Sequence, residues 1–260
     1  MSLEPIKFED GVAYERMMGV WSQLVGSEFL NWLSPRKGQR WIDVGCGNGA
    51  FTEQIVQRCT PAEVQGIDPS EAQISFATNR EGARLAKFQS GDAMGLPFDN
   101  NCFDVATMAL VIFFVPDPVQ GVSEMKRVVR PGGLVAAYAW DVLGGGVPTQ
   151  AITSVLRSLE IKYPLPPSVE ASRMEALSSL WLDAGIRSVD TSVITVERTF
   201  TNFEEFWSTS IGSPSLKPVL ADLSEETIVE IQNTVRNNLP ADADGRITYS
   251  SFANAIKGIV

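Results

Sequence analysis

The segment from Trp41 to Ala50, with the sequence WIDVGCGNGA, constrains this chain more than any other part. A short apolar run carries one acidic residue, Asp43, and three glycines then follow at alternate positions: Gly45, Gly47 and Gly49. Glycine has no Cβ, so it can adopt positive φ and let a ligand approach the backbone closely. A helix that begins directly after such a turn presents free N–H groups to a polar ligand. The segment therefore predicts a buried strand, a tight ligand-binding turn and the start of a helix.

The composition of the 260-residue chain excludes several kinds of chemistry. The absence of histidine removes the commonest general base, imidazole metal ligands and every histidine-dependent nucleophile. The three cysteines, Cys46, Cys59 and Cys102, do not have the spacing of a metal site, so we expect no bound metal. The net charge of −10 disfavours a nucleic-acid partner, because phosphate backbones bind clustered basic residues.

The sequence also indicates a compartment. No apolar run is long enough to span a bilayer, and the N-terminus has no basic segment followed by an apolar one. An odd number of cysteines without a signal peptide favours reduced thiols. We therefore expect a cytoplasmic protein with no membrane partner.

The first 140 residues alternate between apolar runs typical of strands and amphipathic segments typical of helices. We expect strands at about 41–44, 63–67, 84–89, 103–110 and 134–140, and helices at about 12–32, 50–58, 70–79 and 117–130. This alternation with short connections predicts an α/β fold with a doubly wound, mainly parallel sheet.

The alternation breaks after residue 141. Helices are expected at about 151–160, 172–184, 203–210 and 225–238, with strands at 188–197 and within 246–260. The second half is therefore expected to complete the sheet and to carry inserted helices, and not to form a separate domain.

Polar residues follow four successive strands of this predicted sheet. They are Asp43 with the glycine turn, Asp68, Asp92 and the 116–117 segment. Ligands of open α/β sheets bind at the carboxyl ends of the strands, where the topology switches. Asp68 lies about twenty residues beyond the glycines, where a carboxylate can accept from both hydroxyls of a ribose. One such carboxylate is most often a cap or a solvated residue, whereas three beside a glycine turn favour a ligand site.

These motifs resemble those of the class I S-adenosylmethionine-dependent methyltransferases. The most similar group is methyltransferase type 11, the small-molecule enzymes related to the quinone-biosynthesis C-methyltransferases. The resemblance covers about residues 41–140 and rests on DVGCGNG at 43–49, GIDPS at 66–70, GDA at 91–93, LPF at 96–98, FDV at 103–105 and RPGG at 130–133. It implies a seven-stranded, mostly parallel Rossmann-like methyltransferase fold with inserted helices, and S-adenosylmethionine as the cofactor.

The resemblance also implies cofactor contacts for individual residues. Asp43 suits the ammonium group of the cofactor, directly or through water, Asp68 the ribose and Asp92 the adenine. The whole implied set is Asp43, Gly45, Cys46, Gly47, Gly49, Asp68, Pro69, Asp92, Ala93, Ala109, Tyr14 and Trp21. Tyr14 and Trp21 could close over the sulfonium through cation–π contacts, and a place in the helix core is the alternative for Trp21.

The same resemblance implies an organisation and a reaction. One methyltransferase domain would span residues 1–260, with a cofactor-binding core at 36–140, covering helices at 1–35 and substrate-side helical inserts at 141–187 and 200–245. The expected reaction is in-line methyl transfer to a small molecule, which the sequence does not identify. Asp141 and Tyr14 are candidate bases, but we expect the alignment of the two reactants to carry most of the catalysis. The sequence does not indicate an oligomeric state.

Other functions fit parts of the pattern. Residues 45–50 match the loose G-x-G-x-x-A fingerprint of nicotinamide-dependent oxidoreductases, although no hydride-transfer residues accompany it. A non-catalytic S-adenosylmethionine-binding protein would keep the same cofactor motifs. The 242–247 segment is similar to a calcium loop but lacks the carboxylates that such a loop needs at its ends. Residues 108–112 lack the Pro-Pro element of enzymes that methylate nucleic-acid bases.

Overall fold

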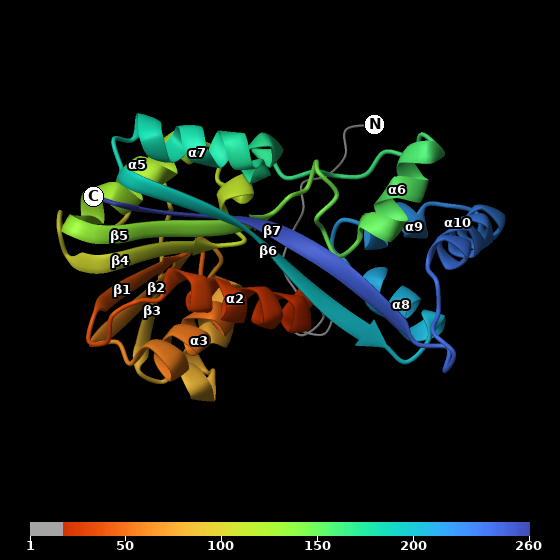
Figure 1. Cartoon of the computed structure of the whole chain (residues 1–260), viewed down its shortest axis with the longest axis horizontal. Helices are drawn as coiled ribbons and strands as arrows, with labels where there is room; N and C mark the ends of the chain where they lie inside the picture. The colour runs from red at the N-terminus through yellow and green to blue at the C-terminus, as the bar shows by residue number, and fades with distance from the viewer. Residues whose placement is uncertain (1–17) are drawn as a thin grey trace.

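A seven-stranded sheet forms the centre of the computed structural model, which describes residues 18–260 (Figure 1). The strand order is β3-β2-β1-β4-β5-β7-β6. The strands are β1 (Arg40–Val44), β2 (Glu63–Asp68), β3 (Ala86–Ser90), β4 (Phe103–Ala109), β5 (Val129–Trp140), β6 (Arg187–Phe200) and β7 (Ile247–Ile259). The first five strands pair in parallel, and β7 runs antiparallel to both β5 and β6. The predicted doubly wound, mostly parallel fold is therefore confirmed.

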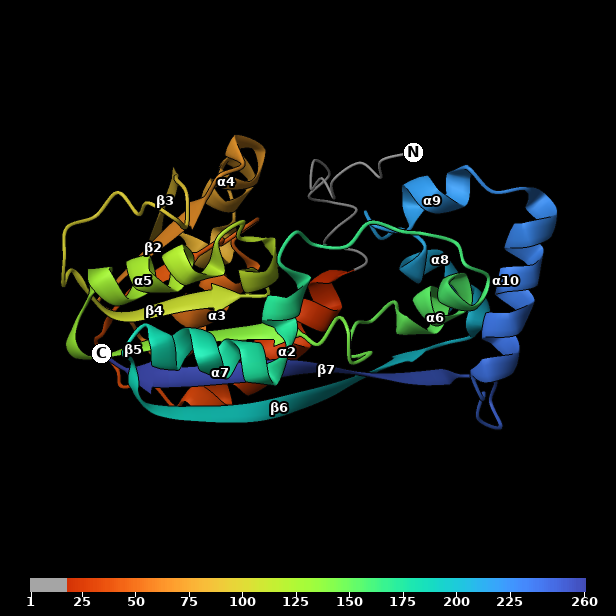
Figure 2. The same cartoon turned by 90° about the horizontal axis from the view of Figure 1, so that it is seen from above.

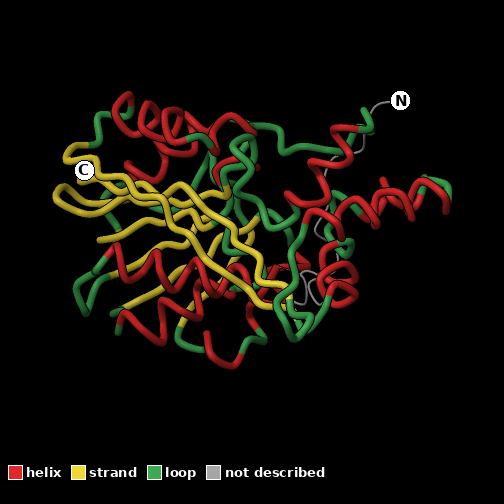
Figure 3. The backbone as a smooth tube through the Cα atoms, turned by 45° about the vertical axis from the view of Figure 1, so that its right-hand side comes forward, coloured by secondary structure: helices red, strands yellow, loops and turns green. Residues whose placement is uncertain are grey.

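Helices cover both faces of this sheet. The described helices are α2 (Val20–Leu33), α3 (Ala50–Cys59), α4 (Glu71–Thr78), α5 (Pro118–Val128), α6 (Gln150–Ser158), α7 (Met174–Asp183), α8 (Phe203–Ser210), α9 (Lys217–Ala221) and α10 (Glu225–Asn238). Figure 1 shows α5 and α7 on one face, and α2 and α3 on the other. The helices α6, α8, α9 and α10 gather at one end, beyond the parallel strands, where β6 and β7 continue (Figures 2 and 3).

Local sequence signals account for several of these elements. The Ser70 hydroxyl accepts from the Gln73 N–H and begins α4. The Asp117 carboxylate accepts from the Gln120 N–H, and Pro118 follows at the first position of α5. Such caps satisfy N–H groups that have no partner within the helix. The sequence therefore predicts where α4 and α5 begin.

The centre of the core lies around β4 and β5. The side chains of β4 from Val105 to Met108 are fully buried, because α5 lies on one face of the sheet and α2 and α3 lie on the other (Figure 1). A strand buried on both faces is a continuous apolar run in the sequence, as 103–110 is. The central position of β4 in the sheet agrees with this pattern, because a central strand covered on both faces needs apolar side chains on both faces.

The observed elements differ from the predicted ones in a few places. The strand β5 begins at Val129, not at Leu134, because an irregularity in the β4 register lets Val129 pair with Phe103 before the Pro-Gly-Gly segment. The short helix α9 was not predicted, and β6 runs on to Phe200. Tyr14 and the rest of the predicted covering segment up to residue 17 lie outside the described residues. No helix within residues 18–260 combines the length and apolar character needed to cross a membrane.

Candidate functional site

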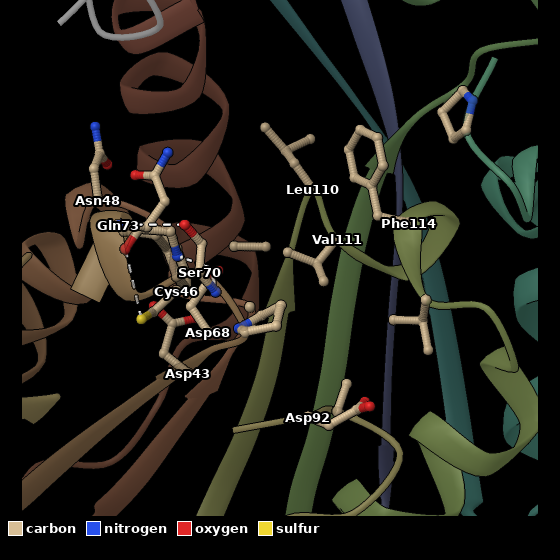
Figure 4. A pocket seen from close by; sticks show the side chains of 18 of the residues that line it. Asp43, Cys46, Asn48, Asp68, Ser70, Gln73, Asp92, Leu110, Val111 and Phe114 are labelled. Atoms are coloured by element: carbon tan, nitrogen blue, oxygen red, sulfur yellow. Dashed lines mark hydrogen bonds between the residues drawn. The ribbon is translucent and has the colours of Figure 1, made fainter. Parts of the chain in front are cut away.

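A cavity of about 840 Å³ lies at the carboxyl ends of the parallel strands, where the strand order reverses between β1 and β4. Ligand sites of open α/β sheets lie at this kind of switch point. In Figure 4 the polar side chains of Asp43, Cys46 and Asp68 lie on one side of the cavity. Leu110 and Phe114, which follow β4, lie on the other side. The cavity therefore has a polar wall and an apolar wall.

The glycine turn forms part of the polar wall. Gly45 has a φ of 75°, and a Cβ at this position would lie 2.4 Å from a methyl carbon of Val111. Gly47 has a φ of 52°, and no heavy atom lies within 4 Å of the place that its Cβ would occupy. The two glycines thus have different tasks. Gly45 lets Val111 pack against the turn, and Gly47 leaves the backbone open to the cavity.

Asp43 is a fully buried carboxyl at the end of β1. Its Oδ2 accepts a hydrogen bond of 2.6 Å from the hydroxyl of Thr52. Its Oδ1 has no hydrogen-bond partner within residues 18–260. Burial raises the pKa of Asp43 to about 7; the Thr52 hydroxyl opposes this rise, the charge of Asp68 adds to it, and the Thr107 hydroxyl opposes it more weakly. The side chain therefore holds an acceptor ready for a donor or a cation in the cavity.

Asp68 joins the glycine turn to the start of α4. Its Oδ2 accepts from the Gly47 N–H at 2.9 Å, and its Oδ1 accepts from the Ser70 N–H at 2.9 Å. Burial raises the pKa of Asp68 in spite of these two hydrogen bonds. A carboxylate has about four acceptor sites, so Asp68 keeps capacity for a ligand after both backbone contacts.

Asp92 lies on the turn that follows β3 and is exposed. Its Oδ1 accepts from the Met94 N–H at 2.8 Å, which stabilises the turn. Figure 4 shows Asp92 apart from Asp43 and Asp68 across the cavity. All three acids predicted from the sequence line the same cavity.

Most of the other predicted cofactor residues line it too: Gly45, Cys46, Gly47, Pro69, Ala93 and Ala109. The Cys46 side chain is buried, and burial raises its pKa well above the usual value, with further rises from the charges of Asp43 and Asp68. Cys46 is therefore a neutral thiol and not a nucleophile. Within residues 18–260, no group of three or more cysteines and carboxylates is arranged to hold a metal ion.

Three predicted residues lie away from this cavity. Gly49 caps α3 with a φ of 80° and faces Ala77 of α4. Trp21 is 2% exposed, and its ring packs against Phe200 and Tyr249 on β6 and β7, which is the core alternative stated for it above. The Oδ1 of Asp141 accepts from the Gly144 N–H at 2.7 Å and so closes a turn. Neither Gly49, Trp21 nor Asp141 is among the residues that line the cavity.

The structure also brings residues to the cavity that the sequence analysis did not select. They are Ser22, Asn48, Ala50, Phe51, Ser70, Gln73, Gly91, Leu110, Val111, Phe114, Val115, Tyr138 and residues 164–167. Pro116, from the predicted 116–117 segment, lines the cavity as well. The place of Ser70 and Gln73 at the cavity could have been predicted from the sequence, because both lie within five residues of Asp68, the acid that ends the second strand. The 164–167 elbow lies within the expected substrate-side insert at 141–187, but its place at the cavity depends on how the chain returns over the sheet.

Comparison with known proteins identifies the domain that contains this site. Residues 42–137 match the family model described as "Methyltransferase domain". A demethylmenaquinone methyltransferase of Staphylococcus aureus is 35% identical over 133 residues, which are 50% of this chain and 53% of the relative. The chain thus matches only about half the length of such curated relatives.

Solved structures share the fold at low sequence identity. The YcgJ protein of Bacillus subtilis aligns with a TM-score of 0.58 and 18% identity, over 90% of this chain and 97% of that chain. The phosphoethanolamine N-methyltransferase 2 of Haemonchus contortus, in complex with S-adenosyl-L-methionine, aligns with a TM-score of 0.58 and 19% identity, over 95% of this chain and 56% of that chain. These structures show that the chain shares their fold, and the family match gives residues 42–137 as the part that is similar to methyltransferase domains.

Proposed function

We propose that this chain is an S-adenosylmethionine-dependent methyltransferase that acts on a small molecule. One observation carries the proposal: Asp43, Asp68 and Asp92 line a single cavity beside the open backbone of Gly47, inside the matched domain. The relative from Staphylococcus aureus is named as a methyltransferase, and the structure from Haemonchus contortus contains S-adenosyl-L-methionine. Both names agree with the proposal.

The residues of the cavity fit this cofactor. The buried Oδ1 of Asp43 lacks a partner within residues 18–260, and a buried carboxylate is stabilised by a donor or a cation. The open space at Gly47 admits a bulky group to the backbone. S-adenosylmethionine has an ammonium group, a sulfonium, a ribose and an adenine, and so supplies both a cation and sugar hydroxyls.

The proposed contacts follow the positions of the acids. Asp43 would hold the ammonium group, directly or through water. Asp68 would accept from the ribose hydroxyls with its remaining lone pairs, and Asp92 would bind the adenine. Pro69, Ala93 and Ala109 would supply apolar surface. The division of the chain into a core at 36–140, covering helices at 1–35 and inserts at 141–187 and 200–245 is part of the same proposal.

The bound cofactor supplies an electrophilic methyl group on a positively charged sulfur. The protein then has to hold an acceptor atom in line with that methyl group, keep water away and leave the acceptor a route to lose its proton. Holding two reactants in line can supply about 7–11 kcal/mol of the barrier. The chain has no histidine, and Asp141 closes a turn outside the cavity. We therefore propose that no single side chain is an indispensable base.

The proposal includes a cytoplasmic location and an acceptor that is not a nucleic acid. The net charge of −10 supports the second point, because nucleic-acid binding draws most of its affinity from basic residues. A nicotinamide-dependent oxidoreductase and a non-catalytic S-adenosylmethionine-binding protein are the competing functions. Turnover of S-adenosylmethionine distinguishes the proposal from both.

Calorimetry with S-adenosylhomocysteine and with NADH tests the proposal. Asp68→Ala removes two charge-assisted hydrogen bonds to the ribose, each worth about 1.5–3 kcal/mol, so affinity for S-adenosylhomocysteine should fall by about a hundredfold or more. Asp242→Ala is the matched control, because Asp242 also accepts from two backbone N–H groups, those of Asp244 and Arg246, and does not line the cavity.

The control should bind S-adenosylhomocysteine like the wild type. Wild-type affinity in Asp68→Ala would overturn the ribose assignment. Tight binding of NADH without binding of S-adenosylhomocysteine would favour the oxidoreductase. Binding of S-adenosylmethionine without label transfer to any metabolite, in a screen with methyl-labelled cofactor, would favour the non-catalytic protein.

A further inference from the structure

A second, smaller cavity of about 110 Å³ adjoins the first one. Leu110, Phe114 and the 164–166 elbow line both cavities, so they form a common wall. Most of the remaining lining comes from residues at and after the end of β5, in and before α6, and in the 213–215 connection between α8 and α9; Met18, Phe113 and Tyr163 complete it. The second cavity therefore lies between the sheet and the inserted helices.

No aspartate, glutamate, lysine or arginine of the described chain lines this second cavity. Its polar side chains include hydroxyls that already have partners close by. The Thr153 hydroxyl donates to the Gln150 carbonyl at 3.4 Å, and the hydroxyls of Ser213 and Ser215 lie 2.9 Å apart in a mutual hydrogen bond. Because a buried charge without a partner is very costly, the cavity suits an uncharged group.

One residue that lines the second cavity has a buried donor without an acceptor. Trp140, the last residue of β5, is 3% exposed, and its indole Nε1 has no hydrogen-bond partner within residues 18–260. Leaving such a buried donor unsatisfied destabilises the protein. Trp181 shows the usual arrangement, since its Nε1 donates to the Val135 carbonyl at 3.1 Å. An oxygen atom on a bound molecule would give Trp140 the partner that it lacks.

We propose that the second cavity receives part of the methyl acceptor, that this acceptor is an uncharged apolar molecule, and that the indole N–H of Trp140 donates to an oxygen on it. Trp140 is thus a positioning residue. The inference rests on the proposed methyl transfer, because it names the class of molecule that would be methylated. The position is suitable, since Leu110 and Phe114 line both cavities, so the second cavity adjoins the larger one.

Three aromatic probes of nearly equal size test the proposal: acetophenone, α-methylstyrene and benzoate. Acetophenone carries a carbonyl oxygen, α-methylstyrene has a CH₂ group in the place of that oxygen, and benzoate adds a negative charge. Binding is followed in protein saturated with S-adenosylhomocysteine through the ¹⁵N-labelled indole signals of the six tryptophans. Trp140→Phe assigns the Trp140 signal by its disappearance.

Acetophenone should shift the Trp140 signal downfield and bind about 2- to 12-fold more tightly than α-methylstyrene, which is the net contribution of one hydrogen bond expressed as a ratio. Benzoate should bind least. Trp140→Phe should bind acetophenone and α-methylstyrene equally. Trp41→Phe is the matched control, because the Trp41 Nε1 is also buried without a partner in the described chain but Trp41 lines neither cavity. It should keep the wild-type preference.

Equal binding of acetophenone and α-methylstyrene to the wild type would overturn the inference, and so would tighter binding of benzoate or an unshifted Trp140 signal. These wild-type measurements stand even if Trp140→Phe does not fold. Failure of S-adenosylhomocysteine to bind would instead overturn the proposed function. The two failures are therefore distinguishable.

Discussion

Asp43→Asn should stabilise the ligand-free protein, and the gain should grow with pH. The fully buried Asp43 carboxyl has a pKa of about 7, against an ordinary value of 3.8, mainly because burial disfavours the charged form. The folded protein thus binds this proton more tightly than the unfolded chain does. The contribution of Asp43 to the free energy of unfolding is therefore highest at low pH and falls as the pH rises from about 4 to about 7.

The size of this effect follows from the two pKa values. A difference of about three pH units corresponds to about 4 kcal/mol at 1.36 kcal/mol per unit, and most of it develops between pH 4 and pH 8. Asparagine cannot ionise, and its Oδ1 can still accept from the Thr52 hydroxyl. The stability of Asp43→Asn relative to the wild type should therefore rise by about 3–4 kcal/mol from pH 4 to pH 8.

Urea denaturation of both proteins at pH 4 and at pH 8 measures this difference, because the other titrating groups cancel between them. Asp104→Asn is a control with the opposite sign. Burial of Asp104 tends to raise its pKa, but hydrogen bonds from the Arg40 N–H and the Arg130 guanidinium outweigh burial and lower it. Asp104 therefore stabilises the protein above its ordinary pKa, and its loss should be more harmful at pH 8 than at pH 4.

An unchanged difference between Asp43→Asn and the wild type at the two pH values would refute the reasoning. The carboxyl would then not be held neutral by burial. If the prediction holds and Asp43→Asn also binds S-adenosylhomocysteine more weakly, the wild-type residue is kept for binding at a cost in stability.

Two further substitutions test the glycine turn and the catalytic model. Gly45→Ala should lose about 2–5 kcal/mol of stability in urea denaturation, because its φ is positive and the new Cβ would overlap Val111. Gly132→Ala is the control: Gly132 has a φ of 77° and open space around it, so this variant should lose only about 1–2 kcal/mol. Equal losses would contradict the role of Val111. When methyl transfer is assayed with an identified acceptor, Asp141→Ala should lower the rate by less than about a hundredfold, because the Asp141 carboxylate closes a turn outside both cavities. A larger loss of rate with normal cofactor binding would identify Asp141 as a base.

The order of strands and helices and the polar edge of the sheet could be predicted from the sequence alone. Apolar runs, caps such as Ser70 and breaks at proline and glycine are local signals, and they act within a few residues of themselves. Parallel strands bring their carboxyl ends to one edge, so Asp43, Asp68 and Asp92 had to lie near one another once the sheet was inferred. The binding turn could be predicted as well, because the glycines at 45, 47 and 49 are a local signal.

Other properties of the site depend on contacts between distant parts of the chain. Trp21 lies in the core because β6 and β7 bring Phe200 and Tyr249 against it, about 180 and 230 residues further along the chain. The second cavity, which Trp140 lines, exists only where the inserted segments return over the end of β5. The raised pKa of Asp43 likewise depends on complete burial. Burial and the presence or absence of a partner are decided by everything that surrounds a group, so only the tertiary structure could reveal them.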